Sequence, residues 1–442
     1  MALALALGTW GGAVAQPQAS DAGFRIVSVP APLNYRQPEG ATAPLRVAVA
    51  AALDRTAAAE PIFVIEALGE SGVEAAPLGL IESLKDLRRT HDLVFVDQRG
   101  AYGTTLVCPP PAGRPGLPSE AIGLFAPERV DACRQAFAGR ADLADLNSRT
   151  FAADVETTRR ALGYGRIELI GYFYGTRIVE DYLRRWPARV TAAVLADPSP
   201  VDYPAAEALG PAGAAAIRST LAACRQERAC HERYPDLDAD WVRVAAQLPG
   251  ETAGNGLLSW LMSRTLRRRT AIDWPSDVRA LASGPAPAVR ARYLAYRRAV
   301  LAGYPLGLRL AVDCAENMPR GRAARAAALD PAGDLKAELA ACRTWPGRRP
   351  PAAFFKPVRA ATPVLAMTGA FDVEAPLDAT RRSLAGFAHA RLVVFPDRAR
   401  ATDFDWEDCA GPLVTAFLES RGRAPVDTAC ASRLRRPAFA AP

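Results

Sequence analysis

A five-residue turn between an apolar run and a helical pattern is the part of this 442-residue chain that most directly suggests chemistry. The turn reads Gly171, Tyr172, Phe173, Tyr174 and Gly175. The run before it predicts a buried strand, and its two glycines would allow a sharp bend with the middle residue at the apex. A phenyl ring has no proton to lose and no lone pair with which to attack. Phe173 therefore supplies no nucleophile at that apex.

Candidates for the acid and the base of such a site come much later in the chain. Asp372 follows the buried-strand pattern at 363–367, and Arg400 lies in the turn after the next strand pattern, at 391–395. Arginine stays protonated at any useful pH, so it cannot act as a general base. None of the three histidines clusters with cysteines at metal-ligand spacing; they are His91, His231 and His389. We predict no metal site and no cofactor.

The order of the predicted elements indicates an α/β fold with a mostly parallel sheet flanked by helices. Short apolar runs, typical of buried parallel strands, alternate with helical patterns in the first half of the chain. The strand patterns are 24–29, 45–52, 61–65, 91–97, 167–170 and 190–196, and the helical ones are 78–87, 154–162 and 175–186. Helical patterns dominate between about 204 and 350. The alternation then resumes with strand patterns at 363–367 and 391–395 and a helix at 409–418.

A sheet domain interrupted by a helical insertion is the simplest account of this order. We expect a signal peptide at 1–15, a core at 24–203 and 351–430, a helical lid at 204–350 and a basic tail at 431–442. The signal peptide is predicted from the apolar start and the small-x-small site Ala13-Val14-Ala15. An alanine-rich tail is the alternative interpretation of this segment.

The eight cysteines fall into four pairs that are local in sequence. The pairs are Cys108 with Cys133, Cys224 with Cys230, Cys314 with Cys342, and Cys409 with Cys430. Four local disulfides are expected, although spacing alone does not fix their connectivity. Disulfides persist in oxidising compartments, so we predict an exported protein, either periplasmic or secreted.

The net charge of +7 does not indicate a nucleic-acid-binding protein. Only three residues are lysines, and the arginines are scattered without interleaved aromatic residues. We therefore predict no nucleic-acid partner. No internal apolar run is long enough to cross a bilayer, so no membrane span is expected either.

The strand–turn–helix resembles the nucleophile elbow of α/β-hydrolases, in which Gly-x-Ser-x-Gly joins a strand to a helix. More narrowly, the chain is similar to exported proline iminopeptidases and tripeptidyl aminopeptidases over most of its length. The stretches that carry this resemblance are Asp97-Gln98-Arg99-Gly100, Cys108-Pro109, Asp154, Leu162-Gly163-Tyr164, Cys314-Ala315-Glu316, Gly369 with Asp372, and Pro376. The cysteine pairing fits the family as well. The resemblance implies a sheet core, a helical lid and an ancestral activity that releases residues from peptide N-termini.

The chain departs from that family at three catalytic places. Phe173 stands where the family has its serine, and Arg400 falls on or next to its histidine, whereas Asp372 keeps the acid. The loop corresponding to the family's oxyanion hole is 66–72, in which Gly69 retains some glycine character and Glu70 adds a negative charge. In a serine protease, loss of the serine or histidine alone costs about 10⁶-fold in kcat. Loss at three distant places predicts an inactive homologue.

The first functional hypothesis is therefore a pseudoenzyme that binds a peptide N-terminus or a small amphiphilic ligand. Its cleft would be lined by Gly69, Glu70, Tyr172, Phe173, Tyr174 and Glu316. In this hypothesis Glu316, which lies in the lid, binds the N-terminal amine of the ligand, and Asp372 forms an ion pair with Arg400. Each residue also has a structural interpretation: the aromatic residues fill the vacated cleft, Glu316 stabilises the lid, and the ion pair is a buried structural one.

Two other hypotheses remain open. One is an active hydrolase with a relocated nucleophile, chosen from Ser71, Thr104, Thr105, Tyr172 or Tyr174. None of these has an identifiable histidine partner near it in sequence. The other is an envelope scaffold whose old cleft is filled and whose outer surface binds an unknown protein partner.

Overall fold

The computed structural model describes most residues of the chain. They are 18–19, 23–57, 59–101, 106–109, 122–137, 142–203, 206–250, 254–265, 271–318, 334–370, 372, 377–396, 398, 400–402, 406–434 and 438–439. The expected signal peptide, Thr104 and Thr105 lie outside them.

The described strands form one sheet of nine in the order β1-β2-β3-β5-β4-β6-β7-β8-β9. Pairs β1·β2, β2·β3 and β3·β5 are antiparallel, and the remaining pairs are parallel. The strands are β1 (Gln18–Ala19), β2 (Arg25–Pro32), β3 (Thr42–Ala50), β4 (Ile62–Ile65), β5 (Leu93–Val96), β6 (Ile167–Tyr172), β7 (Val190–Ala196), β8 (Val364–Gly369) and β9 (Ala390–Phe395). The predicted, mostly parallel sheet is thus confirmed.

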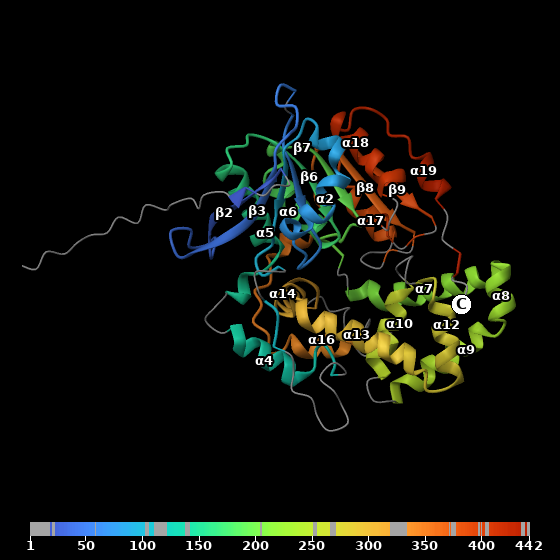
Figure 1. Cartoon of the computed structure of the whole chain (residues 1–442). Coiled ribbons are helices and arrows are strands. Elements are labelled where there is room, and N and C mark those ends of the chain that lie inside the picture. Colours follow the sequence, from blue (N-terminus) through green and yellow to red (C-terminus); the bar gives the residue numbers. More distant parts are fainter. Residues whose placement is uncertain are drawn as a thin grey trace, which may run out of the picture.

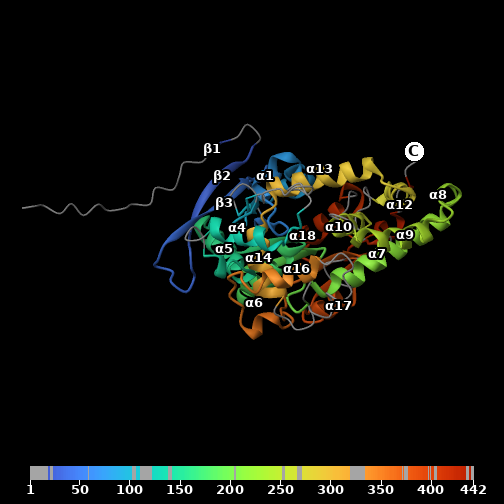
Figure 2. The same cartoon turned by 90° about the horizontal axis from the view of Figure 1, so that it is seen from below.

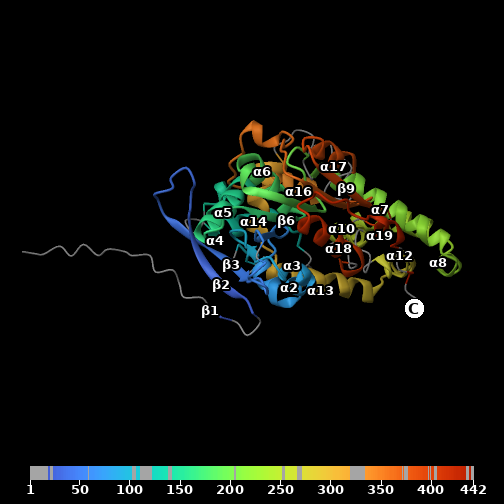
Figure 3. The same cartoon turned by 90° about the horizontal axis from the view of Figure 1, so that it is seen from above.

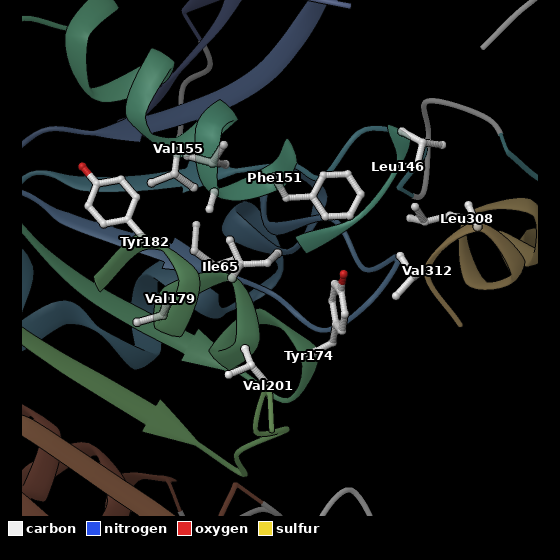
Figure 4. Close-up of a cluster of buried hydrophobic side chains, with 14 of the residues drawn as sticks. Ile65, Leu146, Phe151, Val155, Tyr174, Val179, Tyr182, Val201, Leu308 and Val312 are labelled. Carbon is white, nitrogen blue, oxygen red and sulfur yellow. The ribbon is translucent and has the colours of Figure 1, made fainter. Parts of the chain in front are cut away.

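Burial on both faces explains the continuous apolar runs of the central strands. Successive side chains of a strand point to opposite faces. Phe63 and Ile65 of β4 accordingly join one core cluster, whereas Ile62 and Val64 join another. The first cluster packs against α5 (Ser148–Ala161), α6 (Tyr174–Arg185) and α14 (Leu306–Val312), and the second against α1 (Gly72–Ala75), α3 (Lys85–Arg88) and α18 (Gly411–Glu419). Figure 4 shows part of the first cluster, with Tyr174 directed towards Phe151 and Val312.

Between β7 and β8 the described chain is helical. Its longer elements are α7 (Ala206–Gln226), α8 (Arg228–Arg233), α9 (Leu237–Gln247), α10 (Gly254–Arg264), α12 (Trp274–Ser283), α13 (Pro287–Gly303), α14, the π-helical turn η6 (Asp313–Asn317) and α16 (Asp334–Ala341). Helices α7 to α13 lie together to one side of the sheet (Figure 1), an arrangement also seen from below and above (Figures 2 and 3). They bury an apolar cluster of their own, which includes Leu261 and Trp274.

The remaining elements are short or lie at the ends of the core. They are α2 (Leu80–Ser83), α4 (Pro127–Phe137), α17 (Leu377–Leu384), α19 (Ala429–Arg433), the 3₁₀ turns η1 (Ala76–Leu78), η3 (Leu143–Asp145), η4 (Pro187–Arg189), η5 (Leu248–Gly250) and η7 (Ala352–Phe355), and the π-helical turn η8 (Trp406–Ala410). The prediction of one helix over 78–87 is wrong. Gly79 adopts a φ of +121°, which no continuing helix can accommodate, so η1 ends there. A second break, at Leu84 (φ −110°, ψ +18°), separates α2 from α3.

All four local disulfides are present: Cys108–Cys133, Cys224–Cys230, Cys314–Cys342 and Cys409–Cys430. They indicate that the protein folds in an oxidising compartment, as an exported protein does. Within the described part of the chain, no helix is both long and apolar enough to cross a membrane.

Candidate functional site

The turn between β6 and α6 has the sharp geometry predicted for it. Phe173 takes a φ of +49° and a ψ of −119°, a conformation that a bulky residue adopts only under constraint. Its N–H donates to the Ala196 carbonyl at 2.9 Å, and its own carbonyl accepts from the N–H and hydroxyl of Thr176 at 3.0 and 2.6 Å. These bonds hold the apex between β7 and the first turn of α6. The side chain of Phe173 remains partly exposed.

Both glycines of the turn are required by close backbone contacts. A Cβ on Gly175 would lie 2.2 Å from the Ile65 carbonyl oxygen, and one on Gly171 would lie 2.8 Å from the Thr176 Cα. Real Cβ atoms do not come so close to backbone atoms. The sequence has therefore kept the shape of the elbow although its apex is an aromatic residue.

Arg400 lies directly over that apex. Its guanidinium carbon is 4.3 Å from the centroid of the Phe173 ring, a cation–π geometry. Its Nε is buried without a hydrogen-bond partner, and no carboxylate of the described residues lies within ion-pair distance of it. The two residues predicted to replace the nucleophile and the base thus contact each other, through a stack that carries out no proton transfer.

Asp197 is a buried acid at this site that sequence reasoning missed. It follows β7 immediately, has a φ of +52°, and accepts from the Ala401 N–H at 2.6 Å and from the Thr402 N–H and hydroxyl at 3.1 and 2.6 Å. Burial raises its pKa to about 6, although these hydrogen bonds and the charge of Arg400 act in the opposite direction. Asp197 therefore holds the loop that carries Arg400. An acid at the carboxyl end of a strand beside the elbow strand was the available signal.

Asp372, the expected acid, is buried and accepts from the Thr368 hydroxyl at 3.0 Å. Its backbone N–H donates to the Gly369 carbonyl at 3.3 Å. No ion pair joins Asp372 to Arg400 among the described residues, and the charge of Arg400 acts on Asp197.

The loop at the oxyanion-hole position is close to the elbow and carries negative charge. Gly69 is buried with a φ of +80°, and a Cβ there would meet Pro305 at 2.3 Å, whereas Glu70 is exposed. The pKa of Glu66 is raised to about 8 by burial, then by the charges of Glu70 and Asp97. The exposed carboxylate of Glu70 disfavours an oxyanion in this loop, whereas Glu66, with its raised pKa, is mostly protonated at neutral pH.

The turn after β5 holds that loop in place. Ser71 donates to both oxygens of Asp97, at 2.9 and 2.7 Å, and the Val73 N–H donates to the same carboxylate at 3.1 Å. Gln98 donates to the Glu66 and Ala67 carbonyls at 2.9 and 3.0 Å. Asp97 and Gln98 therefore fix the position of the loop at 66–72 through hydrogen bonds.

The two tyrosines of the turn are buried. Tyr172 packs against Trp406 with ring centroids 5.9 Å apart, and its pKa is raised well above its ordinary value by burial. Tyr174 places its hydroxyl 2.7 Å from the Ser148 Oγ, and burial raises its pKa as well. Of the three aromatic residues, only Phe173 retains partial exposure.

Glu316 belongs to a closed polar network behind the elbow, which we call the Glu316 network (Ser148, Tyr174, Arg177, Glu316 and Asn317). The Glu316 carboxylate accepts from the Ser148 N–H at 2.7 Å and hydroxyl at 2.9 Å, and forms an ion pair with Arg177 at 3.1 Å. Arg177 also donates to the Asn317 side chain at 2.9 Å. Both members of the ion pair have fully buried side chains. In this structure Glu316 joins η6 of the helical insertion to α5 and α6 of the core.

The arrangement keeps the architecture of a hydrolase site without its reactive groups. The mostly parallel sheet and the glycine-flanked elbow after β6 define the α/β-hydrolase fold. Residues 332–430 match the family described as TAP-like protein. The chain thus has the α/β-hydrolase fold, and over residues 332–430 it is similar to the TAP-like proteins.

Curated relatives include the serine protease Hip1 of Mycobacterium tuberculosis and of Mycobacterium bovis. Each is 33% identical to this chain over 140 residues, which cover 29% of this chain and 27% of the relative. The match therefore spans about a quarter of the relatives' own length.

Solved structures with a similar chain path include proline iminopeptidase from Mycobacterium smegmatis, at 14% identity and a TM-score of 0.43, covering 89% of this chain and 98% of that one. A thermophilic esterase from Thermogutta terrifontis gives 14% identity and a TM-score of 0.43, covering 89% and 99%. A serine hydrolase from Cycloclasticus zankles gives 13% identity and a TM-score of 0.42, covering 86% and 96%.

Proposed function

We propose that this protein is a catalytically inactive homologue of the TAP-like peptidases and binds a small ligand or a peptide terminus at the altered elbow. The proposal rests on one observation, the stack of Arg400 on Phe173 at 4.3 Å. A phenyl ring occupies the place of the nucleophile and a permanent cation the place of the base. Without both groups, acyl transfer retains only the rate enhancement that substrate binding and an oxyanion hole supply. Here Glu70 adds a negative charge to the loop expected to form that hole.

The contacts of the alternative nucleophiles argue against a relocated active site. The Ser71 hydroxyl donates its proton to the Asp97 carboxylate, and its oxygen accepts from the Glu74 N–H as the N-cap of α1. Both the proton and a lone pair of this hydroxyl are therefore engaged in structural hydrogen bonds. Tyr172 and Tyr174 are buried with raised pKa values, which disfavours the phenolate that would attack. Thr104 and Thr105 lie outside the described residues.

Charge at the elbow favours a carboxylate on the ligand. Glu316, which was expected to hold an amine, is already bonded to Ser148 and Arg177 and has no exposed surface. Arg400 is the partly exposed charged group over Phe173 and has no carboxylate partner among the described residues. A guanidinium without a partner binds a carboxylate through paired N–H donors. We therefore propose a small carboxylate or a peptide C-terminus as the ligand.

Fluorophosphonate labelling tests the loss of activity. The purified chain is treated with the probe beside an active serine hydrolase, and the intact mass of each is measured. We expect no adduct on this chain and complete labelling of the control. A stoichiometric adduct would overturn the proposal, and peptide mapping would then locate the nucleophile.

A double variant, F173S/R400H, provides the converse test. Because the two replaced side chains are in contact, serine and histidine at these positions would be near each other. We expect slow labelling of the double variant and none of F173S alone, since a serine without a base remains a weak nucleophile. Labelling of F173S equal to that of F173S/R400H would contradict the assignment of position 400.

Titration calorimetry with N-acetylphenylalanine tests the carboxylate preference, and its uncharged amide is the comparison. We expect the acid to bind at least about tenfold more tightly than the amide, with the difference lost in R400Q. Equal binding of acid and amide would exclude recognition of a carboxylate by Arg400.

A further inference from the structure

A second hollow in the molecule lies apart from the elbow. It is a cavity of about 380 Å³ between β3, the turn after β5 and η3, and neither Phe173 nor Arg400 lines it. Cavities that bind small molecules in proteins have volumes of about this size or more. This cavity is therefore large enough to hold a small organic molecule.

Buried apolar side chains form much of the cavity wall. Leu45, Leu106, Phe137 and Leu146 line it, and all four belong to the first core cluster. Ala43 also lines it and lies on the same face of β3 as Leu45, because the two are two residues apart in one strand. A ligand in the cavity would cover these side chains, which favours a ligand with an apolar body.

The positive charges on the wall are already neutralised. Arg46 forms ion pairs with Glu74 at 2.5 Å and with Asp97 at 3.6 Å. Arg99 donates from its Nε to Asp154 at 2.8 Å, and from its other two nitrogens to two backbone carbonyls at 2.9 and 2.8 Å. An anion would therefore have to break existing contacts in order to bind either guanidinium.

The negative charges on the wall are neutralised as well. Asp145 forms ion pairs with Arg36 at 2.7 Å and with Arg348 at 2.8 Å. The positive charge of Arg348 also acts on the neighbouring Asp142. A cation that entered the cavity would lose its hydration and would have to compete with these arginines for the carboxylates.

Thr150 adds an uncharged hydrogen-bonding group to the wall. Its backbone N–H donates to the Asn147 side chain at 3.2 Å, whereas its hydroxyl makes no hydrogen bond to any other residue of the described chain. A hydroxyl can both donate and accept. Thr150 is therefore suited to a hydroxyl or a carbonyl group on the ligand.

We infer that this cavity binds an uncharged, largely apolar molecule that carries one hydroxyl or carbonyl group. The apolar body contacts Leu45, Phe137 and Leu146, and the polar group bonds to the Thr150 hydroxyl. An ion of either sign is disfavoured, because it would exchange its hydration for a wall whose charges are already paired. The inference does not depend on the proposed function, because the wall residues differ from those of the elbow.

Titration calorimetry with three indole compounds of different charge tests the inference. At neutral pH tryptophol is uncharged, tryptamine is a cation and indole-3-acetate is an anion. The titrations use the full native chain and full-length R400Q, in which the proposed carboxylate site at the elbow is removed. We expect tryptophol to bind R400Q at least about tenfold more tightly than either ion does. Equal or tighter binding of an ion to R400Q, no binding of tryptophol to the native chain, or loss of tryptophol binding in R400Q would overturn the inference.

Variants locate the binding. A43F places a large ring in the cavity wall and should abolish tryptophol binding. T150V removes the hydroxyl with little change in volume and should weaken binding by about threefold to tenfold. T42V is the matched control, because Thr42 is an exposed neighbour of Ala43 outside the cavity wall, and it should leave the affinity unchanged.

Thermal denaturation establishes that each variant is folded, and T150V decides the test if A43F does not fold. Unchanged affinity in T150V, or in a folded A43F, would place tryptophol elsewhere and overturn the inference.

Discussion

The elbow and the Glu316 network both involve the beginning of α6, yet they differ in how completely their polar groups are satisfied. At the elbow, Arg400 lies on the Phe173 ring with a buried Nε that has no partner. One turn along the helix, Arg177 makes an ion pair with Glu316 and further bonds to Asn317 and to the chain after β7.

This difference separates the features that stabilise the fold from the side chains that would serve only catalysis. The Glu316 network joins the helical insertion to the core, and loss of Glu316 or Arg177 would leave the other as an unpaired buried charge. The elbow glycines are likewise retained because backbone atoms occupy the space around them. The nucleophile and the base stabilise nothing of this kind. In the function we propose, their replacement removes activity, while the described structure keeps the sheet and the elbow.

The largest expected effect comes from breaking the Glu316 network. E316Q removes the charge that compensates the fully buried Arg177, and we expect a loss of about 3–5 kcal/mol in the free energy of unfolding. Urea denaturation measures this loss. E232Q, which removes an exposed acid paired with Arg228, is the control and should change stability by less than about 0.5 kcal/mol. A loss below about 1 kcal/mol in E316Q would refute the structural role given to the network.

The next effect tests the shape of the elbow. G175A would place a methyl group against the Ile65 carbonyl, and we expect destabilisation by about 1–3 kcal/mol or more. G165A is the matched control, because a Cβ there meets no atom within 4 Å. Equal thermal midpoints for the two variants would show that the elbow is not as tightly packed as described.

Asp197 should make the free energy of unfolding depend on pH. Its pKa of about 6 exceeds its ordinary 3.8, so between these values the folded chain holds a proton that the unfolded chain has released. Stability from this group is therefore greatest below pH 3.8 and falls as the pH rises through 6, by at most about 1.4 kcal/mol per unit. We expect D197N to reduce the loss of unfolding free energy between pH 4 and pH 7 by on the order of 1–2 kcal/mol, as measured by denaturation. An unchanged slope would contradict the shifted pKa.

The smallest expected effect is that of the stack itself. A double-mutant cycle with R400Q and F173L should give a coupling energy of about 0.5–2 kcal/mol, which is the range of cation–π pairs. A coupling energy indistinguishable from zero would mean that the two side chains do not interact in solution.

Much of the fold could be read from local patterns. Runs such as 61–65 are apolar at every position because both faces of their strands are covered, and the glycine spacing at 171 and 175 specified the turn. The helix over 78–87 was predicted incorrectly because its periodicity runs across Gly79 and Leu84, whose backbone angles are not helical. The predicted domain boundaries rest on the same patterns and remain predictions.

The site was accessible to sequence reasoning only in part. The types of residues 173 and 400 already excluded a serine–histidine pair, since chemistry at the level of a single side chain needs no coordinates. Their mutual stacking, the bonding of Asp197 to residues 401 and 402, and the burial of Glu316 against Arg177 could not be inferred.

What the sequence by itself determined was thus the α/β class, the sharp turn, the absence of a nucleophile at its apex and the local pairs of cysteines. These follow from properties of single residues and of short, regularly spaced patterns. The tertiary structure decided which charges meet. Asp197 and Arg400 are about two hundred residues apart in the chain, and Arg177 and Glu316 are 139 apart. Electrostatic and hydrogen-bond energies depend on distance and burial, and only the folded chain sets those.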